Sequence, residues 1–285
     1  MRSLILGLLV GALAALSPVW AFETITLPIP SAAMNKSPNA TVILPDSYRK
    51  GSTRYATLYL LHGWAGSHAD WSQKSGVGKL ADEHDLIIVM PDGGYDKWYV
   101  DSPVSPGDKY ETYIGKEVVA LIDQRFRTLA QKSARAITGL SMGGFGALHI
   151  ALDQAATFGA AGSISGGVDP RPFPDRWNIA GAFGDPVRNA AYWNEVAIIN
   201  NVQRFSGAGI DLAIDCGVDD FFVPSNRALH QRLLELKVAH DYSERPGGHS
   251  WDYWSNAIKY QVLYFSTKFK EKLGADTTAH RPDRA

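Results

Sequence analysis

Short apolar runs along the chain alternate with longer stretches in which apolar residues recur every three or four positions. The short runs predict strands at residues 24–29, 39–44, 57–61, 86–90, 134–138, 158–164 and 210–216. The longer stretches predict helices at residues 110–126, 144–153, 225–236 and 253–273. Strands that alternate with helices predict an α/β fold, with a mostly parallel central sheet and helices on both of its faces.

The predicted strand at residues 134–138 and the helix at residues 144–153 are joined by the sequence Gly139-Leu140-Ser141-Met142-Gly143. A strand, a sharp turn with a central serine and a helix form the nucleophile elbow of an α/β-hydrolase, in which the serine hydroxyl stands clear of the sheet. Glycines let such a turn close without a Cβ clash. Because the pentapeptide is short, its context has to support this interpretation.

That context is the order of the residues that follow Ser141. An α/β-hydrolase carries its serine first, then an acid, then a histidine. Here Asp219 and Asp220 follow the predicted strand at residues 210–216, and His249 lies in a glycine-rich loop before the last helix. Open α/β sheets place their sites at the carboxyl ends of strands. The sequence therefore predicts a triad of Ser141, His249 and one of the two adjacent aspartates.

The loop at residues 62–66, His-Gly-Trp-Ala-Gly, follows the apolar strand at residues 57–61. In an α/β-hydrolase this loop supplies one backbone N–H to the oxyanion hole, and the residue after the nucleophile supplies the second. We therefore expect the N–H groups of Trp64 and Met142 to be the donors, with Gly63 as the alternative upstream donor. His62 is expected to order this loop rather than to titrate in catalysis.

Six motifs, in order, resemble the putative-esterase family, which includes esterase D (S-formylglutathione hydrolase), tributyrin esterases, feruloyl esterases and mycobacterial mycolyltransferases. The resemblance runs from about Val42 to Trp254 and is strongest to the small bacterial esterases. The motifs are Tyr59-Leu60-Leu61-His62-Gly63, Val89-Met90-Pro91-Asp92-Gly93, Trp98-Tyr99, Gly139-Leu140-Ser141-Met142-Gly143-Gly144, Asp215-Cys216-Gly217-Val218-Asp219-Asp220-Phe221 and Gly247-Gly248-His249-Ser250-Trp251-Asp252-Tyr253-Trp254.

The resemblance implies the α/β-hydrolase fold and a role for each triad residue. Ser141 matches the nucleophile and His249 the general base. The acid of the family follows Cys-Gly-x-x, which selects Asp220 and leaves Asp219 in a position often filled by glutamate. With two adjacent carboxylates, Asp219 stays open as the alternative acid. The chemistry expected of such a triad is acyl transfer through an acyl-enzyme, which needs no cofactor and no metal.

The function predicted from these features is that of a serine carboxylesterase acting on small acyl or aryl esters. The same triad becomes an acyltransferase of the mycolyltransferase type if a bound alcohol outcompetes water. Hydrolysis of the thioester S-formylglutathione is a further alternative, although that thioester is made in the cytosol. A non-enzymatic binding module ranks last, because it would need a broken triad or a blocked elbow.

The N-terminus carries the pattern of an export signal. Arg2 precedes an apolar run at residues 4–16, and Val19-Trp20-Ala21 places tolerated residues where a signal peptidase reads. Residues 1–21 are therefore predicted to be a cleaved signal peptide, and the mature enzyme to be secreted or periplasmic. The apolar run is too short to span a bilayer comfortably, so no stable membrane insertion is expected; a retained N-terminal anchor is the alternative.

Length and composition favour one catalytic domain at residues 22–273, followed by a polar, disordered tail at residues 274–285. The chain has 285 residues, of which 45% are hydrophobic, and a net charge of −1. A chain of this size commonly forms a single α/β unit with a large core. Nothing basic enough to follow phosphates is present, so we expect a small ester as the partner and no nucleic acid. The sequence leaves the oligomeric state open.

Between the predicted strand at residues 158–164 and the one at residues 210–216 lies an insertion, at about residues 168–209, that is rich in aromatic residues and proline. A segment of this kind predicts a lid and an apolar pocket for an acyl chain or an aryl ring. The loop at residues 92–108 also follows a strand end, and its aromatic residues either stack on a substrate or brace the elbow. The candidate pocket residues are Trp98, Tyr99, Phe173, Trp177 and Trp251.

The remaining histidines and the one cysteine carry no second site. His68 lies two residues before Asp70, but no further ligand motif completes a metal site. His149, His230 and His240 are expected to have packing or surface roles. Cys216 is the only cysteine, so no intramolecular disulfide is possible, and its place on an apolar strand favours a buried small hydrophobe over a reactive thiol.

Overall fold

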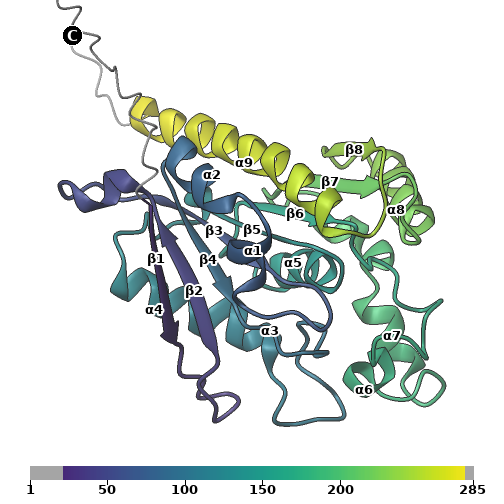
Figure 1. Ribbon diagram of the computed structural model, residues 1–285. Coiled ribbons are helices and arrows are strands. Elements are labelled where there is room, and N and C mark those ends of the chain that lie inside the picture. Colours follow the sequence, from purple (N-terminus) through teal and green to yellow (C-terminus); the bar gives the residue numbers. More distant parts are fainter. Residues whose placement is uncertain (1–21, 280–285) are drawn as a thin grey trace, which may run out of the picture.

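The computed structural model describes residues 22–279 and the side chains of residues 22–274. The predicted signal peptide and the last six residues of the predicted tail lie outside the described residues. Eight strands form one sheet in the order β1-β2-β4-β3-β5-β6-β7-β8 (Figure 1). They span Glu23–Pro28, Asn39–Leu44, Ala56–Leu61, Leu86–Pro91, Arg135–Gly139, Ala160–Ile164, Asp211–Gly217 and Asp241–Arg245, numbered β1 to β8.

The sheet is mostly parallel, as predicted. Strand β2 runs antiparallel to its two neighbours, and every other neighbouring pair is parallel. The short strand β8 was not predicted, because it lies at the edge of the sheet and carries mostly half-buried polar residues. Its pairing with β7 depends on backbone hydrogen bonds, which need no apolar pattern.

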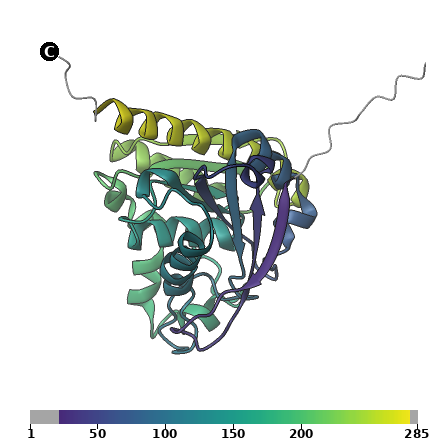
Figure 2. The same cartoon turned by 90° about the vertical axis from the view of Figure 1, so that its left-hand side faces the viewer.

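Helices cover both faces of the sheet. The side chains of successive residues in each central strand point alternately to one face and the other. In β3, Leu58 and Leu60 face the layer of α1, α2 and α9, whereas Tyr59 and Leu61 face the layer of α4, α5 and α8. This is why the central strands read as continuous apolar runs. In two views α9 runs along the top of the molecule (Figure 1, Figure 2). The helices are α1 Asp70–Lys74, α2 Val77–His84, α3 Tyr110–Thr112, α4 Val119–Arg125, α5 Met142–Asp153, α6 Ile179–Phe183, α7 Ala190–Val196, α8 Val223–Glu235 and α9 Trp251–Ala279.

The helix predicted at residues 110–126 is not one regular helix. Its middle, Tyr113–Val118, is a π-helix between α3 and α4. Gly115 lies in this segment and faces α5 so closely that a Cβ there would be 2.8 Å from the Gln154 side chain and 3.1 Å from that of Ile150. The spacing of apolar residues predicted where the helix lies, but it gave no sign of the wider turns of a π-helix.

The last helix, α9, continues to Ala279, six residues beyond the predicted end at Leu273. The helix therefore overlaps residues 274–279 of the tail, and the disorder predicted for the tail stays a prediction. A polar composition removes the reason to pack, but it does not stop an existing helix from adding further backbone hydrogen bonds.

The predicted insertion at residues 168–209 folds into two short helices, α6 and α7, and two 3₁₀ turns, Ile198–Asn200 and Val202–Phe205. Figure 1 shows α6 and α7 together at the lower right. Phe183 of α6 and Trp193 of α7 are both buried, with ring centroids 5.3 Å apart. No helix in the described part of the chain is long and apolar enough to cross a membrane.

Candidate active site

Ser141 occupies the sharp turn between β5 and α5. Its φ is 55°, a left-handed value that costs free energy in a residue with a side chain. Hydrogen bonds hold the turn: the Ser141 N–H donates to Ile164 O (2.9 Å), and Ser141 O accepts from the N–H groups of Gly144 (3.0 Å) and Gly167 (3.2 Å). The structure thus shows the strained serine of a nucleophile elbow.

Two glycines of the elbow lie against the end of β3. A Cβ on Gly143 would lie 2.5 Å from the His62 carbonyl oxygen and 2.6 Å from that of Leu61. A Cβ on Gly139 would lie 2.7 Å from Leu61 O and 2.7 Å from the carbonyl atoms of Gly143. These neighbours are backbone atoms in a sheet and a helix and have little freedom to move aside. The steric reason expected for the glycines is therefore confirmed.

The structure brings Ser141, His249 and Asp220 together in one hydrogen-bonded chain. His249 Nε2 lies 2.9 Å from Ser141 Oγ, and His249 Nδ1 lies 2.8 Å from Asp220 Oδ2. Because the carboxylate accepts a hydrogen bond from the Nδ1–H group, the Nε2 lone pair faces the serine hydroxyl. The Asp220 side chain is fully buried, and 17% of the His249 side chain is exposed.

The neighbouring aspartates have different environments. Asp219 is exposed, and its described contact is a backbone one, from its N–H to Gly247 O (3.0 Å). Asp220, by contrast, accepts the Phe222 N–H at its Oδ1 (2.8 Å) just before α8. A buried carboxylate needs such donors, so Asp220 is held by both the helix start and His249.

The loop that carries His249 rests on the end of β7 and β8. Buried Asp215 of β7 accepts hydrogen bonds from Tyr253 Oη (2.5 Å) and from the Arg245 guanidinium. A Cβ on Gly217 would lie 2.2 Å from Gly247 O, so the loop approaches the strand as closely as backbone allows. Sequence reasoning missed this support, although an acid in the buried part of a mostly apolar strand was a signal for it.

The expected oxyanion donors lie beside the serine. Gly63 and Trp64 line the same cleft as Ser141, and Met142 follows Ser141 as the first residue of α5. Among the described residues, the N–H groups of Gly63, Trp64 and Met142 donate to no other group. Unpaired donors at a cleft are available to a ligand oxygen. The choice between Trp64 and Gly63 stays open, as it was in the sequence.

His62 orders the oxyanion loop from beneath. The Gly93 N–H donates to His62 Nε2 (2.8 Å), so the other ring nitrogen, Nδ1, donates to Gly63 O (2.8 Å). Burial lowers the pKa of His62 below its ordinary value, and both hydrogen bonds require the neutral ring. The expected ordering role is confirmed.

Of the five candidate pocket residues, the structure brings only Trp177 and Trp251 to the cleft with Ser141, which has a volume of about 330 Å³. Phe173 lines a neighbouring cavity. Trp98 and Tyr99 are fully buried, so their assignment to the pocket is wrong. They brace the site instead: Tyr99 Oη donates to His62 O (3.0 Å), and the Trp98 ring packs on Phe145 of α5. An aromatic loop after a strand end does not reveal which way its rings turn.

Four further residues that the sequence did not single out surround the triad. Asp70 and Lys74 pair through Lys74 Nζ and Asp70 Oδ2 (3.0 Å), and both line the cleft. Trp254 also lines the cleft, with its ring 4.9 Å from that of His249. Phe221 also packs against His249, with ring centroids 4.3 Å apart. Phe221 and Trp254 each end one of the six motifs, but the motifs gave neither residue a role, and Asp70 and Lys74 belong to none of the six.

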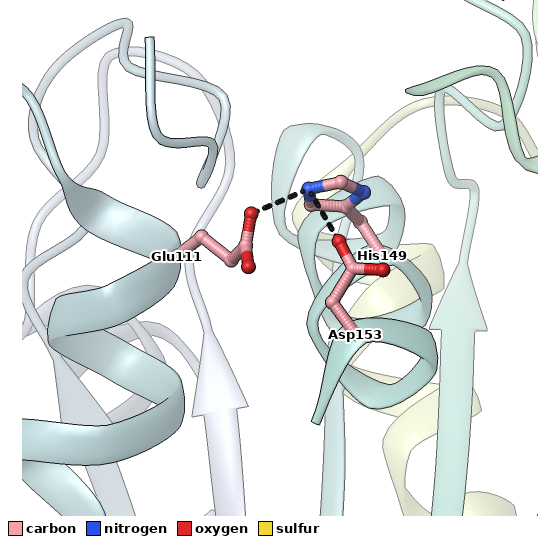
Figure 3. Close-up of side chains that lie close together, drawn as sticks. All are labelled: Glu111, His149 and Asp153. Carbon is pink, nitrogen blue, oxygen red and sulfur yellow. Dashed lines mark hydrogen bonds and ion pairs between the residues drawn. The ribbon is translucent and has the colours of Figure 1, made fainter. Parts of the chain in front are cut away.

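His149 lies on α5 between two carboxylates (Figure 3). His149 Nε2 is 3.1 Å from Glu111 Oε2 of α3 and 3.6 Å from Asp153 Oδ2, one turn further along α5. Arg204 forms an ion pair with Asp153, so the Asp153 carboxylate is paired with a guanidinium group as well as lying near His149. The cluster ties α3 and the insertion to α5, which agrees with the packing role expected for His149.

The other singled-out side chains also have structural partners. Thr41 Oγ1 lies 2.8 Å from His68 Nδ1, and His230 and His240 are hydrogen-bonded to each other (2.7 Å). Cys216 is fully buried, and burial raises the pKa of its thiol above the ordinary value. A thiol of this kind is not a nucleophile at neutral pH, as the sequence predicted.

The sheet order, the strained serine turn and the position of the site at the carboxyl ends of the strands define the α/β-hydrolase class. The chain belongs to the putative esterase family, whose sequence profile matches residues 31–265. The family resemblance predicted from the six motifs is therefore confirmed.

Three comparisons place the chain among its relatives. It is 33% identical over 247 residues to an esterase of Mycobacterium tuberculosis, a match that covers 77% of this chain and 54% of that protein, so the chain spans about half the length of this relative. It is 26% identical over 219 residues to an acetyl esterase of Caldicellulosiruptor saccharolyticus, covering 73% of this chain and 82% of that one. The structure of a ferulic acid esterase superposes with a TM-score of 0.75 at 26% identity, covering 87% of this chain and 99% of that one.

The close packing of the elbow predicts a large effect for Gly143→Ala. The added methyl group meets two backbone carbonyls of β3, and overpacking of this kind costs about 1–3 kcal/mol, or roughly 2–12 °C in melting temperature for a chain of this size. Gly107→Ala is the matched control, because no atom lies within 4 Å of its added Cβ. Thermal melting followed by circular dichroism measures both variants; equal melting temperatures contradict the packing argument.

Proposed function

We propose that the protein is a serine carboxylesterase that hydrolyses small acyl or aryl esters. The observation that carries this proposal is the hydrogen-bonded chain from Ser141 through His249 to Asp220. Membership of the esterase family supports it, as do relatives described as esterase, acetyl esterase and ferulic acid esterase. A cleft of about 330 Å³ suits a small ester.

The first step forms an acyl-enzyme. His249 Nε2 takes the proton of Ser141 Oγ as that oxygen attacks the ester carbonyl carbon. The buried Asp220 carboxylate holds the ring orientation and stabilises the imidazolium that results. Negative charge develops on the carbonyl oxygen, where the N–H groups of Met142 and of Trp64, or Gly63 in its place, donate to it. As the carbonyl re-forms, the C–O bond to the alcohol breaks, and His249 gives its proton to the leaving alcohol.

The second step releases the acid. A water molecule loses a proton to His249 Nε2 and attacks the acyl carbon, and the bond to Ser141 Oγ then breaks as His249 returns the proton to the serine. This cycle is redox-neutral and leaves the enzyme unchanged. An alcohol in place of water gives acyl transfer by the same steps, and product analysis in the presence of an added polyol separates the two reactions.

Ser141→Ala removes the proposed nucleophile. We expect ester turnover to fall by about 10⁴–10⁶ in kcat, because only binding and the oxyanion donors remain. The melting temperature should stay close to that of the wild type, since a hydroxyl at a cleft supports little packing. Activity is measured with p-nitrophenyl acetate, and a loss of less than about tenfold would exclude Ser141 as the nucleophile.

The two aspartates give a matched pair of variants. Asp220→Asn presents an amide N–H to His249 Nδ1 or loses the Phe222 bond, and the wrong tautomer costs about 10⁴ in kcat. Asp219→Asn alters an exposed side chain and should leave kcat within a fewfold of wild type. Steady-state kinetics on the same ester compares the two. The reverse ranking would make Asp219 the acid.

We further propose that the enzyme is exported, on the pattern of Arg2, the apolar run at residues 4–16 and Val19-Trp20-Ala21. Mass spectrometry of the protein from its native host should find Phe22 as the mature N-terminus. Leu8→Glu, which places a charge in the apolar run, should leave the full-length chain in the cytosol. Intact Met1 on the wild-type chain in the cytosol contradicts export, and intact Met1 in the membrane fraction indicates the retained anchor.

A further inference from the structure

Two cavities meet at Trp177. The catalytic cleft of about 330 Å³ contains Ser141 and His249. A neighbouring cavity of about 470 Å³ is lined largely by apolar side chains, among them Phe173 and Phe221. Within the described part of the chain, Trp177 is the one residue that lines both cavities. Trp177 therefore borders both the cleft that holds the proposed nucleophile and the second cavity.

The indole is packed into an aromatic wall. It stacks on Phe221 with ring centroids 5.3 Å apart and an interplanar angle of 17°. It also contacts Phe173 (5.5 Å) and Phe222 (5.3 Å). Phe221 in turn lies 4.3 Å from the His249 ring. The wall is thus continuous from the second cavity to the imidazole of the triad.

The backbone fixes the position of this indole. Trp177 and Asn178 both have positive φ, 47° and 53°, a conformation that residues with a side chain adopt only when their surroundings enforce it. The buried Trp98 side chain donates from Nε1 to Trp177 O (3.0 Å), and the Asn178 side-chain amide donates to Asp96 Oδ2 (2.8 Å). Since the main chain is held from the core, the size of the side chain at position 177 decides how far the cleft extends.

We propose that Trp177 is a specificity-determining residue of the ester site: its indole limits the apolar group that the cleft accepts, and the cavity behind it takes a longer group when the indole is removed. The proposal rests on the proposed esterase function. The group is an alkyl chain or an aryl ring, since most of the cavity wall is built from phenylalanine, proline and tryptophan residues, with Asp175 and Arg176 as its two charged residues. It belongs either to the acyl part or to the alcohol part of the ester.

Two substrate series identify the part of the ester concerned. The first contains p-nitrophenyl esters from acetate to dodecanoate, and the second contains acetates of alcohols from ethanol to dodecanol. For Trp177→Ala we expect the ratio of kcat/KM between the longest and the shortest substrate to rise at least about tenfold over wild type in one series, since each accommodated methylene changes discrimination severalfold or more. The series that responds identifies the acyl or the alcohol part.

Phe173→Ala is the matched control. It enlarges the second cavity but leaves the indole in place, so the ratio should stay within about twofold of wild type. An unchanged ratio in both series for Trp177→Ala overturns the proposal. A uniform fall in kcat/KM along both series also overturns it, because that result shows a structural role alone.

A reaction that needs no turnover separates this proposal from the esterase function. In an alkyl fluorophosphonate, Ser141 Oγ attacks phosphorus, the P–F bond breaks, fluoride leaves, and the serine proton passes to His249 and then to solvent. Intact mass spectrometry follows the rate for ethyl and dodecyl probes. Trp177→Ala should raise the dodecyl-to-ethyl rate ratio at least about tenfold. That rise without ester hydrolysis supports the role of Trp177 and rejects the esterase function; an unchanged ratio, or no labelling of Ser141 in either protein, overturns the role.

Discussion

The site depends on one close approach, that of the turn between β5 and α5 to the carboxyl end of β3. Gly139 and Gly143 bring this turn to within backbone contact of Leu61 and His62, a distance that no other residue permits. The approach forces Ser141 into a left-handed conformation and places the loop after β3 beside it. The strained Ser141 and the unpaired N–H groups around it are therefore products of the same contact.

A second constraint brings His249 to that turn. Asp220 and His249 lie in loops after β7 and β8, which are separated from β3 by other strands of the sheet. Because all the strands from β3 to β8 are parallel, these loops still lie at the same edge of the sheet as the loop after β3, the edge formed by the carboxyl ends. The carboxylate of Asp215 fixes the histidine loop through Arg245 and Tyr253. Buried charge is stable only when it is well bonded, so this network also limits how far the loop can shift.

The aromatic residues around the site divide into a buried set and a partly buried set with different consequences. Trp98 and Tyr99 have no access to the cleft, but they hold the backbone of Trp177 and His62. Trp177 and Trp251 line the cleft itself. The buried Trp98 thus positions the main chain of Trp177, a residue that lines the cleft. The shape of the cleft is consequently set by contacts one layer below its surface.

The sequence by itself determined the α/β fold and the order of the six motifs along it, and it singled out Ser141 and His249 as candidate site residues. Alternating elements dictate a parallel sheet, and parallel strands bring their carboxyl ends to one edge. Tertiary structure alone decided which of the two aspartates is buried, which aromatic rings reach the cleft, that β8 pairs at the sheet edge and that a π-helix interrupts the segment between α3 and α4. Each of these depends on the direction of a side chain or on a contact between distant segments, and a local pattern of polar and apolar residues records neither.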